Sequence, residues 1–121
     1  MDRGAESVGR GFMKTARDIA QHVNSGGSAV EVVQDALNRI QSDTSNAFRE
    51  TFDESALAAA AGIDRRIAGG EPGGSLAGVP VAIKDNICTT QGRTSCGSKM
   101  LEDYRSPFDA TVVTRLQEAG A

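Results

Sequence analysis

An apolar run near the middle of the chain limits the possible folds more than any other feature. Val79-Pro80-Val81-Ala82-Ile83 lies between Gly78 and the polar sequence Lys84-Asp85-Asn86. The length and β-branched content of this run predict a buried strand, and Pro80 is tolerable near a strand's start. Because a buried strand must pair its backbone N–H and C=O groups, it needs neighbouring strands in a sheet.

Helices are predicted on both sides of this strand. No second strand follows, although a helix that stops at Gly120 ordinarily leads into the next strand of a βαβ unit. We therefore expect an α/β domain over residues 14–121 that is incomplete in this chain, preceded by a mobile tail over 1–13. The predicted helices span about 14–23, 28–41 (with a Ser28–Glu31 capping box), 54–68 (N-cap Asp53) and 110–119 (N-cap Asp109).

The composition excludes several classes of protein. Thirteen Lys and Arg against 16 Asp and Glu leave a net charge of −3, without the basic footprint of direct nucleic-acid binding. No run reaches the ~18 apolar residues of a membrane span, and the first residues lack the apolar region of a secretory signal. Two cysteines are too few for a disulfide framework, and their spacing does not suit zinc. We expect a cytoplasmic protein with reduced thiols and no metal.

Lys84 is the main candidate for chemistry. A lysine at the carboxyl end of a buried strand lies where α/β sheets gather their ligands. Burial disfavours the charged form of an amine, and a neutral lysine is a competent general base or nucleophile. The alternative is a lysine whose side chain reaches the surface and pairs with Asp85.

A glycine-containing loop and the two cysteines are weaker candidates for a functional site. Gly92 to Lys99 superficially resembles a phosphate-binding loop, but that motif requires Lys and then Ser or Thr after the second Gly, whereas here Ser98 precedes Lys99. We therefore exclude a nucleotide site. Cys88 and Cys96 are expected to be small buried residues rather than nucleophiles.

Three stretches of sequence between Leu76 and Val113, called blocks here, resemble the amidase signature family and occur in the family's order. The similarity covers residues 14–121, and the helix from Ser28 to Ile40 also resembles the family's N-terminal helix. It implies the amidase signature fold, a mixed sheet flanked by helices, of which this chain holds the N-terminal part. The blocks are Leu76-Ala-Gly-Val-Pro-Val-Ala-Ile-Lys-Asp-Asn-Ile-Cys-Thr89, Thr94-Ser-Cys-Gly-Ser-Lys-Met-Leu101 and Ser106-Pro-Phe-Asp-Ala-Thr-Val-Val113.

The resemblance implies a Ser–cis-Ser–Lys triad. Lys84 corresponds to the family's lysine, which acts as the general base and, through a bridging serine, activates a nucleophilic serine. Both serines of the family lie in Gly/Ser-rich segments that follow this region. Ser95, Ser98 and Ser106 do not lie in such a segment, so this chain alone is expected to be inactive.

Within the family, the blocks are most similar to the amidase subunits of tRNA-dependent amidotransferases. The resemblance implies that glutamine is hydrolysed and that ammonia passes to a partner protein. That partner activates mischarged Glu-tRNA(Gln) or Asp-tRNA(Asn) with ATP and magnesium. The resemblance also implies a heterotrimer with the amidotransferase B and C subunits, tRNA contact mainly through the B subunit, and no cofactor in this chain.

Two alternatives remain open. One is an amidase of the same family that acts on small or lipid amides. The other is a non-catalytic interaction fragment in which the helices over 28–41 and 54–68 form a docking surface. Loss of activity on replacing Lys84 would favour an enzyme, whereas partner binding that is independent of Lys84 would favour the docking role.

Overall fold

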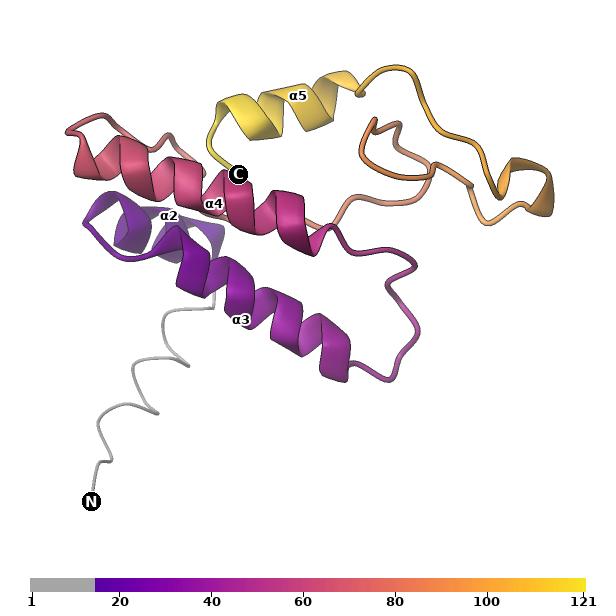
Figure 1. Cartoon of the computed structure of the whole chain (residues 1–121), viewed down its shortest axis with the longest axis horizontal. Coiled ribbons are helices and arrows are strands. Elements are labelled where there is room, and N and C mark those ends of the chain that lie inside the picture. Colours follow the sequence, from indigo (N-terminus) through magenta and orange to yellow (C-terminus); the bar gives the residue numbers. More distant parts are fainter. Residues whose placement is uncertain (1–14) are drawn as a thin grey trace.

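Helices and long irregular segments make up the part of the chain that the structure describes. The computed structural model describes residues 15–121, so the predicted tail over 1–13 lies outside the described residues. The elements are α2 (Ala16–Asn24), α3 (Ala29–Ser42), α4 (Asp53–Ala68), the 3₁₀ turn η1 (Lys99–Leu101) and α5 (Thr111–Glu118). Figure 1 shows α2, α3 and α4 grouped together, while the segment between α4 and α5 extends to one side. No helix within 15–121 has the length and apolarity needed to cross a membrane.

The start of α3 is capped twice. The Ser28 hydroxyl accepts a hydrogen bond from the Glu31 N–H at 3.2 Å, which confirms the predicted cap. The carboxylate of Asp64, on α4, accepts from the Ala29 N–H at 2.7 Å and from the Val30 N–H at 3.3 Å. A carboxylate at a helix N-terminus satisfies free backbone donors and complements the helix dipole. Asp64 therefore links α4 to the beginning of α3.

One apolar core holds α2, α3 and α4 together. Val23 is fully buried, and burial of such a side chain is worth about 1.5–3 kcal/mol. On α3, the spacing of the sequence predicts an apolar face of Val30, Val33, Leu37 and Ile40. Val33 and Leu37 are buried as predicted, but Val32 is buried too, and Val30 and Ile40 are only half-buried. The helix is thus rotated slightly from the predicted face. The core consists of Ile19, Ala20, Val23, Ala29, Val32, Val33, Leu37, Ala60, Ala77 and Val79.

The expected strand over residues 79–83 is not formed. Val79 is buried, but Val81 is 43% exposed, and no strand occurs anywhere within residues 15–121. The physical reason is the absence of a neighbour: among the described residues, Pro80 to Ile83 make no backbone–backbone hydrogen bond. The mixed sheet is therefore not present in this part of the chain.

Segment 73–78 pairs instead with the end of α5. The Leu76 N–H donates to the Ala119 carbonyl at 2.8 Å, and the Gly78 N–H donates to the Gly120 carbonyl at 2.9 Å. Gly120 has a φ of +96°, as expected for the residue that ends a helix. These contacts hold the C-terminal residues against segment 73–78, and Figure 1 shows the end of the chain after α5.

Two predicted N-caps are wrong. Asp53 is the first residue of α4, and Phe52 occupies the cap position without a side-chain hydrogen bond. Ala110 occupies the cap position of α5 and makes no side-chain hydrogen bond there. The Asp109 carboxylate instead accepts hydrogen bonds from the N–H and hydroxyl of Thr90. The Asp109 side chain therefore anchors the preceding loop rather than the helix.

Candidate active site

Lys84 lies at the point where the extended segment 79–83 turns into a long loop. Its side chain is exposed, and its carbonyl accepts a hydrogen bond from the Ile87 N–H at 3.0 Å. No ion pair joins Lys84 to Asp85 within residues 15–121. The amine is thus presented at the surface of the described residues, and Asp85 is engaged elsewhere.

Asp85 holds the far side of this loop through Ser95. The Ser95 N–H donates to one carboxylate oxygen of Asp85 at 2.8 Å, and the Ser95 hydroxyl donates to the other. The Asp85 carbonyl accepts from the Cys96 N–H at 2.9 Å. Ser95 is 7% exposed, so the contact is shielded from solvent on that side. Asp85 and Ser95 therefore close the loop directly after Lys84.

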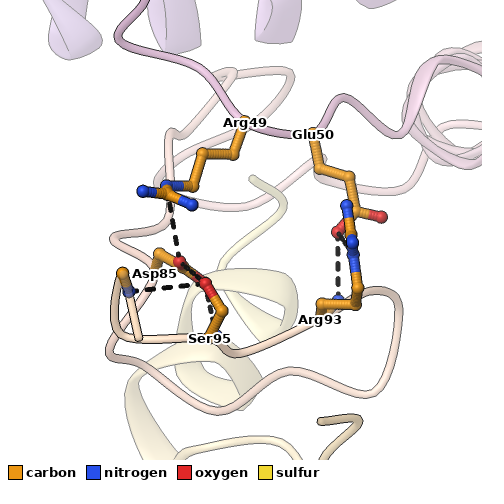
Figure 2. A network of polar contacts seen from close by, with 6 residues as sticks. Arg49, Glu50, Asp85, Arg93 and Ser95 are labelled. Carbon is orange, nitrogen blue, oxygen red and sulfur yellow. Dashed lines mark hydrogen bonds and ion pairs between the residues drawn. The ribbon is translucent and has the colours of Figure 1, made fainter. Parts of the chain in front are cut away.

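Two adjacent residues of the connection between α3 and α4 form ion pairs with this loop (Figure 2). The Arg49 Nε lies 3.7 Å from the Asp85 carboxylate. The Glu50 carboxylate lies 3.5 Å from the Arg93 Nε and accepts from the Arg93 N–H at 3.1 Å. Arg49 and Glu50 thus reach two points of the loop that begins at Lys84.

Hydrogen bonds to the charged form lower the pKa of Asp85 below its ordinary value of 3.8. The Ser95 hydroxyl has the largest effect on the pKa and the Ser95 N–H the next, whereas burial acts in the opposite direction and raises the pKa. The positive charge of Arg49 adds a smaller effect. Asp85 is therefore a carboxylate that stays ionised while it orders the loop.

Replacing Ser95 by alanine is expected to raise the pKa of Asp85 toward 3.8, because the largest stabilising contact to the carboxylate is lost. A lowered folded-state pKa contributes stability that is present above the unfolded-state value and disappears as pH falls through the folded-state value. The alanine variant should therefore lose the Asp85 contribution at a higher pH than the unmodified chain. Carbon-13 NMR of the Asp85 carboxyl group during an acid titration measures the change.

Ser98 provides the matched control. Its hydroxyl accepts from the Met100 N–H and makes no contact with Asp85. Ser98→Ala should leave the Asp85 titration where it is in the unmodified chain. An equal displacement in both variants would show that Ser95 has no particular role.

The residues around Lys84 were not identified by sequence reasoning. Ser95 is ten positions after Asp85, and no periodicity or motif links them. Cys88 is half-buried and Cys96 is exposed, so the expectation of two buried thiols is wrong for Cys96. Both thiols are free. Within the described range 15–121, no group of three or more His, Cys, Asp or Glu side chains is placed to hold a metal ion.

Comparison of this sequence with known proteins identifies the family to which the chain belongs. The family model described as Amidase matches residues 31–121. The A subunit of the Gloeobacter violaceus glutamyl-tRNA(Gln) amidotransferase is 52% identical over 96 residues, which cover 78% of this chain and 20% of that protein. The corresponding A subunit of Rhodopirellula baltica is 45% identical over 113 residues, which cover 91% of this chain and 23% of that protein. The chain thus spans about a fifth of the length of these curated relatives, and it belongs to the amidase family.

Proposed function

We propose that residues 14–121 form the N-terminal portion of the amidase domain of a glutamine-hydrolysing subunit. The subunit would supply ammonia for the amidation of mischarged Glu-tRNA(Gln) or Asp-tRNA(Asn). The supporting observation is 44–52% identity to glutamyl-tRNA(Gln) amidotransferase A subunits over most of this chain. In that complete domain, segment 79–83 would find the strand neighbours that it lacks within residues 15–121.

Lys84 is the base in this proposal. Its neutral amine accepts a proton through a bridging serine, and the nucleophilic serine oxygen attacks the carboxamide carbon of glutamine. The C–N bond breaks, the nitrogen leaves as ammonia with the transferred proton, and an acyl-enzyme ester remains. Water then cleaves the ester to glutamate and regenerates the serine. Both serines come from the rest of the domain, and the exposed Lys84 side chain is accessible to them.

The reaction needs partners that this chain does not provide. Ammonia would pass to the B subunit, which binds most of the tRNA and uses ATP and magnesium, and the C subunit would complete the heterotrimer in the cytoplasm. The net charge of −3 supports this division, since tRNA contact favours a basic surface.

A hybrid subunit tests the proposal. In it, this chain replaces the matching 113 residues of the Rhodopirellula baltica A subunit, whose remaining residues complete the domain. Assembled with the B and C subunits of that organism, the hybrid should release ammonia from glutamine. The isolated 121-residue chain should release none.

Other results with the hybrid subunit would favour either a different amidase or a docking fragment. Hydrolysis of small amides without turnover of glutamine would favour a different amidase. An assembled hybrid whose tRNA amidation from free ammonium is normal, but which hydrolyses no amide, would contradict the catalytic role and favour a docking fragment.

A further inference from the structure

We propose that Asp85 is a positioning residue for the base Lys84, and that Ser95 and Arg49 hold Asp85 in place. This inference rests on the proposed function, because it assigns a task to the residues that surround the proposed base. Asp85 follows Lys84 directly, and its carboxylate contacts Ser95 and Arg49.

Backbone hydrogen bonds fix the chain on the C-terminal side of Lys84. The Lys84 carbonyl accepts from Ile87 at 3.0 Å, and the Asp85 carbonyl accepts from Cys96 at 2.9 Å. The Asp85 carboxylate takes both donors of Ser95. The two peptide units that follow Lys84 are therefore each held by a hydrogen bond, and the Asp85 side chain is held by Ser95. Such restraint matters for a base, because a displacement of about 1 Å can cost roughly 100-fold in rate.

The same contacts keep the carboxylate away from the amine. A carboxylate beside a lysine favours the charged form of the amine, which cannot accept a proton. Ser95 and Arg49 engage the Asp85 carboxylate, and the Gly97 backbone also stabilises its charged form. Arg49 is the charged group among them. Figure 2 shows Arg49 on one side of Asp85 and Ser95 on the other. This arrangement orders the loop without forming a Lys84–Asp85 ion pair.

The restraint also links the loop to the helical core. Arg49 lies in the connection that leaves α3, and its neighbour Glu50 binds Arg93 on the same loop. Ser55, in the first turns of α4, donates to the Gln91 side chain at 2.8 Å. The position of Lys84 is thus coupled to the packed helices through several independent contacts. Arg49 is 66% exposed at its side chain, so its ion pair contributes less than the Ser95 contacts.

Kinetics of the hybrid subunit test the inference. Asp85→Ala should lower kcat for glutamine by about 10–100-fold and leave KM within about twofold, because the base is displaced while the substrate site is not. Asp85→Asn should recover kcat to within about threefold of the unmodified hybrid, since its amide preserves the geometry with Ser95. Ser95→Ala, which leaves Asp85 itself in place, should lower kcat by about 5–20-fold.

Asp35→Ala is the matched control, because Asp35 is an exposed carboxylate that pairs with Arg39 on α3, outside the loop after Lys84. It should leave kcat unchanged. Unchanged kcat in a folded Asp85→Ala hybrid would overturn the inference, and so would a loss that Asp85→Asn does not recover. Full activity of Lys84→Ala would instead overturn the proposed function. If Lys84→Ala is inactive and Asp85→Ala is fully active, only the positioning role fails.

Discussion

Replacing Lys84 by alanine in the hybrid subunit is expected to lower the turnover of glutamine by about 10⁴-fold. Removal of one member of a nucleophile–base triad commonly costs this much, because the remaining members act only as a unit. The exposed Lys84 side chain makes no ion pair within residues 15–121, so the loss should not come from unfolding. Continuous measurement of ammonia release from glutamine, with the B and C subunits present, gives the rate.

Lys99→Ala is the control for the loss of one positive charge. Lys99 is an exposed lysine at the start of η1, on the same long segment between α4 and α5. Its replacement should leave ammonia release within about twofold, as is usual for surface substitutions. Amidation of tRNA from free ammonium should continue in the Lys84→Ala hybrid. Unchanged glutamine turnover in that hybrid would exclude Lys84 as the base.

The helices of this chain could be predicted because their signals are local. The Ser28 cap, the apolar spacing along α3 and the glycines after α4 each act within a few residues. The buried face of α3 could be predicted only in part, since the burial of Val32 depends on how α3 packs against its neighbours. The N-cap predicted at Asp109 failed because its carboxylate binds Thr90 instead. The N-cap predicted at Asp53 failed because α4 begins one residue earlier, with Phe52 at the cap position.

The strand over residues 79–83 could not form from its own sequence. β-branched residues favour extended backbone, but a strand exists only when another strand accepts its hydrogen bonds. Within residues 15–121 none does so, and Val81 remains exposed. The interpretation of this run as a strand therefore depends on residues that the described part of the chain does not contain.

The candidate site was predictable only at its centre. Lys84 was identified because it follows an apolar run and belongs to a block that resembles the amidase signature family. Its neighbours Arg49 and Ser95 approach Asp85 from distant parts of the sequence, and each contact exists only after the loop has closed. Nothing in the spacing of an arginine, an aspartate and a serine reveals such a closure.

The second large effect is expected at the junction between α5 and segment 73–78. In Gly120→Ala, the new Cβ would lie 2.2 Å from the carbonyl oxygen of Gly73, and the φ of +96° is strained for any side chain. Because the opposing atom belongs to the backbone, it cannot move aside cheaply. We expect the docked end of α5 to be destabilised by about 3 kcal/mol, the combined cost of strain and overpacking.

Amide hydrogen exchange in the 121-residue chain measures this loss where it occurs. Leu76 and Gly78 donate to Ala119 and Gly120, so their amides should exchange roughly 100-fold faster in Gly120→Ala. Gly26→Ala separates strain from collision, because Gly26 has a similar φ of +102° but no atom within 4 Å of a new Cβ. It should leave exchange at Leu76 and Gly78 unchanged and cost about 1 kcal/mol near the end of α2. Protection of Leu76 and Gly78 that survives in Gly120→Ala would contradict the prediction, because it would show that the junction accommodates a side chain at residue 120.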